Sequence, residues 1–505
     1  MKPAPPVTMM RTAAASAGLS PFPRLQTSQW EGVRAPLAIP ALLLLDAIVV
    51  ARDYAAGDAW ALVSVACIAI AAGRTRAHAV AGAAIALGLF LGTWRTAPLQ
   101  LAHEISGVRL GGIVVSDVTS EPWGDSFELL GDDGRRYAVS VRARIAAGER
   151  IAVRGRLAPF DGPRNPGEPS ARDLARERGL TARVESAALV ARSPPDRYDM
   201  RALPARLRAS ATSTLHRFLG EPDATILAGM LYGARGALAP ELRAEFQDTG
   251  TVHVLVTAGL HLGVVAAVLA FILSRIGLGR VPAALGAIPL VWCYAILSGA
   301  HVPSLRAATM VTIALLARAL GERAISLNTL AFAAIVVSAM WPAWVGGASF
   351  GLSFSCVGAI VLFAEPIAAS LERLRIPHVL REALALTLAT QIGVWPLTAS
   401  TFLVIAPYAA LANLFVVPVV GVALICGMML LAVSPIVPLA TLVARLEAWP
   451  LAWIEHAVRL VAALPLAHVV ATPPPSWDLA FYDAAMILAA WLWAITFLFD
   501  RRHRR

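Results

Sequence analysis

Apolar blocks of bilayer-spanning length are the feature of this chain that most restricts its fold. Of its 505 residues, 57% are hydrophobic and 15% are charged, whereas soluble domains carry about 25% charged residues. A helix needs about 20 residues to cross the hydrocarbon core of a bilayer, and the apolar residues gather in runs of that order. The sequence therefore predicts a polytopic α-helical membrane protein.

The candidate spans form two blocks, which a polar region separates. Residues 1–34 are rich in Pro, Ala and Ser and predict a disordered cytoplasmic tail, with no cleaved signal peptide. The first block, 35–94, predicts three N-terminal transmembrane helices, at about 35–51, 58–73 and 77–94. The second block, 252–499, has candidate spans at about 252–274, 282–299, 302–319, 325–341, 349–364, 382–400, 409–433 and 479–498.

One stretch of the second block is interrupted by charge. Between residues 436 and 470 the apolar run contains Arg445, Glu447, Glu455, His456 and Arg459. We interpret this stretch as an interfacial or re-entrant helix pair, since ionisable residues are costly inside a bilayer.

Positive charge orients the predicted spans. The net charge is +10, and Lys2 is the only lysine, so arginine carries almost all of it. Basic residues favour the cytoplasmic side, and they occupy alternate connectors: 73–76, 275–280, 318–323, 373–381 and the end of the chain at 501–505. This pattern places the region after the third span outside the cytoplasm.

That outer region, residues 98–197, has a strand pattern. Short alternating runs such as RRYAVSVRA are bounded by turn signals such as GDDG at 131–134. About five strands in this length predict an inserted extracytoplasmic OB-like β domain, with a helical patch near Ser170–Arg178. Its arginines are offset by many acids, so charge alone gives no nucleic-acid footprint.

The aromatic residues of this domain have two interpretations. Trp123, Phe127 and Tyr137 could stack on the bases of a single strand. Aromatic side chains of this kind more often fill the interior, and a barrel core is the leading interpretation.

Residues 200–249 predict amphipathic helices, because apolar positions recur at helical spacing with arginines between them. The leading interpretation is surface helices packed at the mouth of a channel, and direct contact with a substrate is the alternative.

Two histidines lie near the start of the second block, within DTGTVHVLVTAGLHLGVV at 248–265. His253 lies at the outer end of its span, where water can reach it. His261 follows eight residues later, about 80° round an ideal helix, so the two can share a face unless Gly259 breaks the helix. For His261, polar packing and a place on a transport pathway are equally open.

Three further polar residues lie in predicted spans. Arg306 follows Pro303, which suits the first turn of a helix. Its side chain could snorkel to the headgroups, bind phosphate or fix a neighbouring helix. Gln391 and Asn413 lie near prolines, and we expect them to bond backbone groups that those prolines free.

Several kinds of chemistry have no motif in this sequence. The chain has no HExxH, GxSxG or P-loop sequence, which argues against a nucleotide-driven motor or a hydrolase. The four cysteines have no metal-ligand spacing and read as small buried residues: Cys67, Cys293, Cys356 and Cys426. We expect no enzyme activity, no cofactor and no metal site.

Several ordered motifs resemble one known family. FQDTGTVHVLVTAGLHLG at 246–263 is similar to its Phe-x-x-Thr-Gly-x-x-His-(apolar)-Ser-Gly-Leu-His signature. RNPGEPSARDLARERGL at 164–180 looks like part of its outer domain. The other matches are Gly299-x-x-x-Pro303-x-x-Arg306, SFGLSFSCVGAI at 349–360, and the series Gln391, Pro396, Phe402, Asn413 and Pro418. Over about 35–435 the chain resembles the ComEC-type competence channels, which pass single-stranded DNA through the bacterial inner membrane.

The chain departs from that pattern at a few places. Ala258 stands where the family usually has serine, Ser349 replaces a glycine, and Gly351 replaces a polar residue. Many members also carry a C-terminal metallo-β-lactamase-like domain, and no such sequence follows the last predicted span. Strand degradation, if it occurs, is then expected from another polypeptide.

The resemblance implies a multi-pass protein of the bacterial inner membrane that conducts DNA during transformation. The implied pathway residues are His253, Gly259, His261, Pro303, Arg306, Gln391 and Asn413, and the implied nucleic-acid contacts are Trp123, Tyr137 and Asn165. The implied partners are single-stranded DNA, a DNA receptor on the outer side, a cytoplasmic helicase or motor, a separate nuclease and a second copy of the chain. The alternatives are a transporter or flippase of a small or lipidic substrate and, more remotely, an intramembrane enzyme built on the two histidines.

Overall fold

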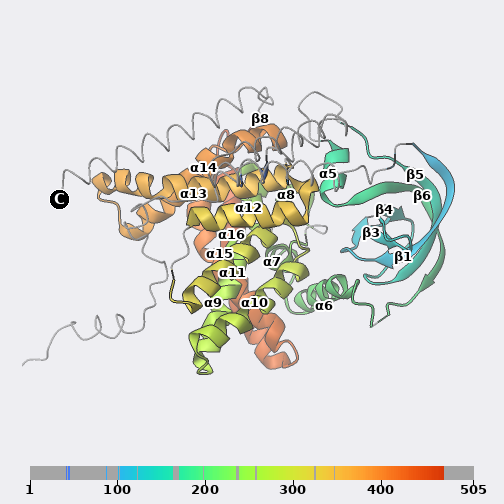
Figure 1. Ribbon diagram of the computed structural model, residues 1–505, viewed down its shortest axis with the longest axis horizontal. Helices are drawn as coiled ribbons and strands as arrows, with labels where there is room; N and C mark the ends of the chain where they lie inside the picture. Colours follow the sequence, from blue (N-terminus) through green and yellow to red (C-terminus); the bar gives the residue numbers. More distant parts are fainter. Residues whose placement is uncertain are drawn as a thin grey trace, which may run out of the picture.

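The computed structural model describes residues 101 and 103–470, with short gaps at 122, 163–169, 197, 235–237, 256–258, 323–325 and 346, and also residues 41, 44, 45 and 87. Strands gather at one end of the molecule and helices make up the rest (Figure 1). The predicted tail, nearly all of 35–94 and the predicted span 479–498 lie outside the described residues, as does Asn165.

The strands form the predicted OB-like barrel. They are β1 (Ile105–Val114), β2 (Thr119–Glu121), β3 (Gly124–Gly131), β4 (Arg136–Val141), β5 (Arg150–Ala158) and β6 (Leu180–Ser193). Five of them close in the order β1–β3–β4–β6–β5–β1, while β2 pairs only with β3 among the described strands. The β4–β6 pair is parallel and the others are antiparallel. A closed five-stranded barrel of this kind is typical of OB folds.

Alternation of side chains fills the barrel. Buried and less buried residues alternate along β3 and along most of β4, because successive side chains of a strand point to opposite faces. The interior contains Phe127, Leu129, Val139, Val153 and Val184, among others.

A short helix, α5 (Ala171–Glu177), joins β5 to β6. The Ser170 hydroxyl caps it by accepting hydrogen bonds from the backbone N–H groups of Arg172 and Asp173, at 3.1 and 3.4 Å. The predicted helical patch near Ser170–Arg178 is thereby confirmed.

Three helices follow the barrel: α6 (Leu203–Phe218), α7 (Asp223–Tyr232) and α8 (Pro240–Asp248). The interpretation of 200–249 as surface helices is wrong for α7, in which every residue from Ala224 to Tyr232 is buried. A helix that is apolar on all sides is stable only in a protein interior or a membrane, and ATILAGMLY has almost no polar face.

The second block forms a short 3-10 turn, η2 (Val252–Leu255), and eight α-helices. These are α9 (Gly259–Arg275), α10 (Arg280–Leu297), α11 (Val302–Ala319), α12 (Ser326–Met340), α13 (Ala348–Leu371), α14 (His378–Phe402), α15 (Ala409–Val433) and α16 (Val437–Ala462). In the described part of the chain, six of them are long and apolar enough to cross a membrane: α10, α11 and α13 to α16. The predicted polytopic α-helical architecture is thereby confirmed.

Two predicted spans differ from the structure. The span at 252–274 is not one α-helix, because η2 ends at Leu255 and α9 begins at Gly259. The stretch at 436–470 is not a re-entrant pair, because α16 is continuous over 26 residues. Glu and Arg are good helix formers, so charge within an apolar run does not end a helix; α16 even accommodates Pro450.

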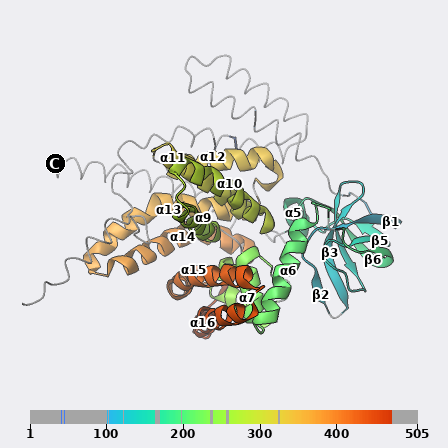
Figure 2. The ribbon, with the colours of Figure 1, turned by 90° about the horizontal axis from the view of Figure 1, so that it is seen from below.

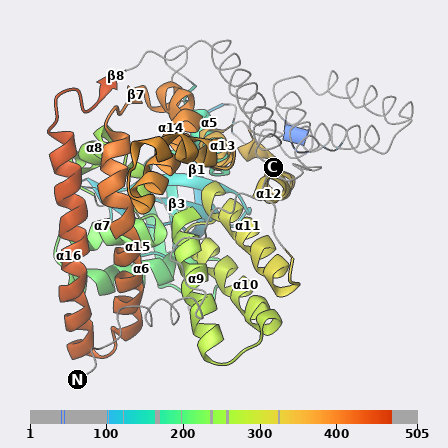
Figure 3. The same ribbon diagram turned by 90° about the vertical axis from the view of Figure 1, so that its left-hand side faces the viewer.

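The helices pack around two apolar cores. One core joins α6, α7, α8 and η2 to α15 and α16, and we call it the α15–α16 unit. The other core joins α9 to α13, and we call it the α9–α13 unit. Figure 3 shows α15 beside α16, with α9 and α10 as a separate pair.

The barrel and the basic connectors lie at opposite ends of the same helices. The end of α10 at Leu297 and the start of α13 at Ala348 are the ends that meet the barrel region. Arg275 and Arg280 lie at the other end of α10, and Arg373 and Arg375 lie beyond the other end of α13. This separation agrees with an outer barrel and cytoplasmic arginines.

Candidate nucleic-acid interface and translocation path

The barrel carries an open groove on its outer surface. A cavity of about 550 Å³ is lined by Trp123, Gly124, Asp125, Ser126, Ser140, Val141, Arg142, Ser186 and Ala187. It lies over β3 and β4, the second and third strands of the closed barrel, and this is the face on which OB folds bind oligonucleotides.

The aromatic residues of the barrel divide between the groove and the interior. Trp123 is 66% exposed and lines the groove, so the core interpretation is wrong for this residue. Phe127 and Tyr137 are buried as predicted. The Tyr137 hydroxyl also donates to Asp133 Oδ2 at 2.6 Å, so its ring is not presented for base stacking.

The charge of the groove comes from Arg142, whose side chain is exposed. The other charged group, Asp125, is already paired: its carboxylate accepts hydrogen bonds from Arg144, the Ile145 backbone and Ser120, at 2.8, 2.7 and 2.8 Å. Burial alone would raise the pKa of Asp125, but these bonds outweigh it and lower the pKa. The carboxylate stays ionised and compensated, which leaves Arg142 to meet an anion.

Two contacts dock the barrel region on the helices, and sequence reasoning missed both. The guanidinium of Arg208, on α6, donates hydrogen bonds to Asp117 Oδ1 at 2.6 Å and to the Leu297 carbonyl at 2.9 Å. The Glu177 carboxylate accepts hydrogen bonds from the Ala348 backbone and the Ser349 hydroxyl at the start of α13. Figure 2 shows α5 and α6 between the barrel and the other helices.

The dock at Glu177 is tight. Trp344 donates through Nε1 to the Glu177 carbonyl at 2.5 Å, and the Glu177 side chain leaves no room for a Cβ at Gly347. Ser349, which departs from the family pattern, therefore has a structural partner here. These contacts join residues about 170 positions apart, and no spacing in the sequence marks them.

Arg306 is buried among the helices. It is 5% exposed, its Nε donates to Ser353 Oγ on α13 at 2.8 Å, and its guanidinium lies 5.8 Å from the centre of the Phe354 ring. Of the three interpretations, these contacts favour the fixing of a neighbouring helix over snorkelling to the headgroups. Among the described residues no carboxylate forms an ion pair with Arg306. Pro303 lies in the first turn of α11, as predicted.

The start of α9 meets this arginine. A Cβ at Gly259 would lie 3.6 Å from Arg306 Nη2, which is ordinary contact distance. His261 is buried two residues later. His253, on the exposed part of η2, is near enough to His261 for their charges to interact, and its Nδ1 lies 3.0 Å from the Gly250 carbonyl.

Asn413 lies close to the same turn. Gly250 has a left-handed φ of +68°, and a Cβ there would lie 2.8 Å from that of Ala409 at the start of α15. Asn413 is buried one turn further along α15, and its Oδ1 accepts no hydrogen bond from the described residues. The predicted bond to a carbonyl that a proline frees would come from the Asn413 amide N–H group, so it stays a prediction.

Gln391 is half-buried in α14. The helix α13 packs against both α11 and α14, and its Cys356 links the two: the thiol lies near enough to Arg306 for an electrostatic interaction and is hydrogen-bonded to Thr390, the residue before Gln391. Gly393 allows the close approach of α13 and α14, because a Cβ there would overlap Ala359. The structure thus groups Arg306, Gly259 and His261, and places the α14 segment that carries Gln391 across Cys356 from Arg306.

This arrangement suits anion contact and base stacking. The groove offers an indole and a guanidinium, and the helices hold a second guanidinium against a neutral hydroxyl. Within the described residues, no group of three or more His, Cys, Asp or Glu side chains is arranged to hold a metal ion.

Comparison with known proteins adds an independent observation. A family model described as competence protein matches residues 230–496. ComE operon protein 3 of Bacillus subtilis (strain 168) is 31% identical over 142 residues, which are 28% of this chain and 18% of that relative. The chain thus aligns with less than a fifth of this relative's length. No solved structure matches the chain.

Proposed function

Because the chain belongs to the competence protein family, whose model covers residues 230–496, we propose that it is an inner-membrane channel that passes single-stranded DNA into the cytoplasm. The chain itself performs no bond-breaking step in this proposal. It offers a path, and another component supplies the pulling force.

One observation carries the proposal. The barrel docks on α13, and α13 also supplies the hydrogen-bond partner of the buried Arg306 of α11. Glu177 meets α13 at Ala348 and Ser349, and Ser353, about one turn further on, accepts the hydrogen bond from Arg306. A strand bound at the barrel is therefore directed toward the only region of the α9–α13 unit, within its described residues, where a buried cation has a neutral partner.

The groove of the barrel is the proposed receiving site. Stacking of a base on an aromatic ring contributes about 1–3 kcal/mol and tolerates any base. Trp123 is exposed for such stacking, and Arg142 can meet the neighbouring phosphate. Tyr137 is excluded from this role by its burial.

The cluster of Arg306, Gly259 and His261 is the proposed constriction. A phosphate can take the place of Ser353 at the guanidinium, because a charged acceptor binds more strongly than a neutral one. Gly259 leaves room beside the arginine, and His253 lies exposed before α9. Pro303, Gln391 and Asn413 would then shape helices near the path.

The partners follow from the same proposal. We expect a DNA receptor at the outer barrel and a helicase or motor on the side of the basic connectors. A separate nuclease and a second copy of the chain complete the expected set.

Uptake of labelled DNA into the cytoplasm tests the proposal, with Arg306→Ala compared with the wild type at matched membrane levels. Loss of a hydrogen bond to a charged group costs about 1.5–3 kcal/mol, and each 1.36 kcal/mol is tenfold in rate. Cytoplasmic uptake should therefore fall roughly 10- to 100-fold while outer DNA binding persists.

Two comparisons make the result decisive. Arg445→Ala removes an exposed arginine of α16 and should leave uptake unchanged. A clean deletion should abolish uptake; a deletion strain of a competent host that still takes up DNA normally would favour the transport of a small or lipidic substrate instead.

A further inference from the structure

A carboxylic acid is buried in the middle of α16. Glu447 is 0% exposed and lies ten residues after the start of the helix, or about 15 Å along it. Among the described residues, its carboxyl group has no hydrogen-bond partner other than the thiol of Cys426 on α15. A thiol is only a weak donor.

The charged group that faces Glu447 from α7 is also an acid. Asp223 begins α7 and is near enough for its charge to repel that of Glu447. On α16 itself, Arg445 is exposed, and Arg459 is bound to Glu455 at 2.6 Å and to Glu245 of α8 at 3.5 Å. The nearby basic group of α6, His216, contacts Glu221 at 3.0 Å.

An ionised Glu447 would thus be a buried charge without compensation. Such a charge costs several kcal/mol even after relaxation of the protein, and a carboxyl in this position holds a proton instead. Intramembrane acids of this kind commonly mark proton relays.

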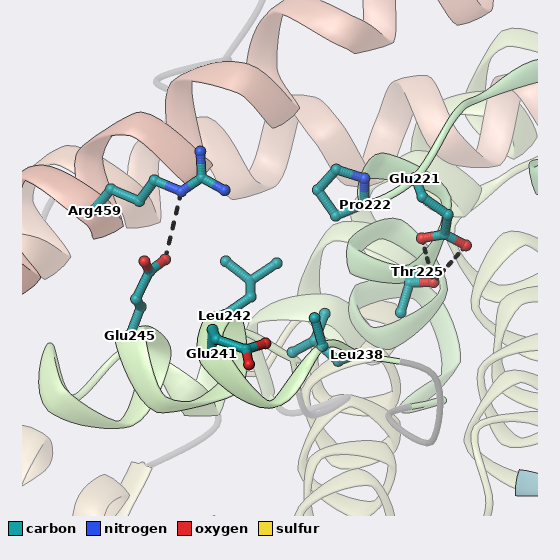
Figure 4. Close-up of a pocket in the computed structure, with 9 residues that line it drawn as sticks. Glu221, Pro222, Thr225, Leu238, Glu241, Leu242, Glu245 and Arg459 are labelled. Atoms are coloured by element: carbon teal, nitrogen blue, oxygen red, sulfur yellow. Dashed lines mark hydrogen bonds and ion pairs between the residues drawn. The ribbon is translucent and has the colours of Figure 1, made fainter. Parts of the chain in front are cut away.

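A water-accessible cavity lies beside α7 and α16, the helices of Asp223 and Glu447. It has a volume of about 600 Å³ and lies among α7, α8 and α16 (Figure 4). Its lining includes Glu221, Glu241, Glu245 and Arg459. The strand β7 (Val404–Ile405) follows the end of α14 and pairs with β8 (Val469–Val470), which follows the end of α16. The start of α14 adjoins a basic, cytoplasmic connector, so this opposite end of α14 and α16, where Arg459 lines the cavity, is on the outer side.

Asp223 lies between the cavity and Glu447. It adjoins the lining residue Pro222, and its charge interacts with those of Glu455, Glu221 and Glu447. Burial, then repulsion by Glu455 and Glu221, raises the pKa of Asp223. A raised pKa makes the Asp223 carboxylate a better proton acceptor than an ordinary aspartate.

We propose that Glu447 is the proton-binding site of a proton-coupled step, loaded from the outer cavity through Asp223. The proposal rests on the transport function above and adds the ion that drives or gates it. Each transfer moves one proton from a carboxylic acid to a carboxylate, so that no other reactant is needed. Return of the proton from Glu447 to the Asp223 carboxylate leaves a bare charge on Glu447 between α15, α16 and α7, which favours separation of these helices.

Infrared spectroscopy of the full chain in lipid vesicles tests the proton itself. The wild type at neutral pH should show the C=O absorption of a protonated carboxyl, which Glu447→Gln removes. Glu322→Gln, at an exposed position outside this unit, should keep it. A spectrum that is unchanged by Glu447→Gln would overturn the assignment.

DNA uptake in cells tests the coupling. Glu447→Gln keeps the shape of the side chain but cannot release a proton, so uptake should fall at least about tenfold at matched membrane levels, with partial recovery in Glu447→Asp. Asp223→Asn, at a half-buried position, should slow uptake and make it less dependent on the outer pH. Normal uptake in both variants would overturn the coupling.

The two readouts separate this inference from the function on which it rests. If the deletion strain takes up DNA normally, the channel and the coupling fall together, while the infrared band still assigns a proton to Glu447. If deletion abolishes uptake and Glu447→Gln does not reduce it, only the coupling fails.

Discussion

The two helical units of this protein surround a buried charged side chain in opposite ways. In the α9–α13 unit, Arg306 has a hydroxyl partner in Ser353 at 2.8 Å and an aromatic ring nearby. In the α15–α16 unit, Glu447 has only the weak donor Cys426 as a hydrogen-bond partner among the described residues, and an acid, Asp223, as its neighbour. The first unit holds a cation in place, and the second favours a neutral acid.

This difference suits the two units to different ions, phosphate in one and the proton in the other. A guanidinium bound to a neutral group can exchange that group for a phosphate, whereas a carboxyl in an acidic environment repels phosphate and accepts a proton. The barrel is docked through Glu177 on α13, which belongs to the arginine unit. We therefore expect DNA to pass by the α9–α13 unit and protons to reach the α15–α16 unit.

The first prediction, which has the larger expected effect, tests the role of the Ser353 hydroxyl beside Arg306. Ser353→Ala removes the hydrogen bond to a buried cation, which should lower the free energy of unfolding by about 1–3 kcal/mol. Because phosphate replaces this hydroxyl during transport, uptake should fall much less than in Arg306→Ala. Chemical unfolding and DNA uptake measure the two effects.

Ser370→Ala is the matched control on the same helix. The Ser370 hydroxyl donates to the Pro366 carbonyl of its own helix at 2.9 Å. If Ser353→Ala abolished uptake as Arg306→Ala does, the hydroxyl would be part of the path rather than a group that phosphate displaces.

The smaller effect concerns the dock of the barrel on the arginine unit. Burial raises the pKa of Glu177, although its bonds to Ser349 and Ala348 oppose this. A carboxyl whose pKa is higher in the folded than in the unfolded state stabilises the folded state at acidic pH. This contribution is complete below the pKa of the unfolded state and is lost as the pH rises through the pKa of the folded state. Docking should therefore weaken toward neutral pH, by less than about 1 kcal/mol.

Glu177→Gln should remove this pH dependence, because the amide stays neutral and can still accept a hydrogen bond. Thermal unfolding at about pH 5 and about pH 8 measures it, with Glu322→Gln, at an exposed position away from the dock, as the control. A pH dependence that persists in Glu177→Gln would assign the effect to another group.

The sequence predicted what local pattern and hydropathy determine. Apolar runs located α10 to α15, alternation located the barrel, and Gly259 was recognised as the point where the helix of His253 and His261 could break. The burial of Phe127 and Tyr137 followed from their aromatic character.

The remaining features depend on contacts between distant segments. Glu177 meets Ser349, and Asp223 meets Glu447, across more than 150 residues, and no periodicity encodes such pairs. The charges of 436–470 suggested an interrupted helix, yet Glu447 is enclosed by α7 and α15 within a continuous one. Trp123 is exposed because it precedes β3 at a turn rather than pointing into the barrel.

Cross-linking of arrested DNA tests the division between the two units most directly. A single strand with a bulky group at its trailing end would be stalled during uptake, and a photoreactive amino acid would replace either Ser353 in α13 or Leu451 in α16. Our account predicts that DNA cross-links at position 353 and not at position 451. Cross-links at position 451 alone would contradict it, because DNA would then pass by the acidic unit.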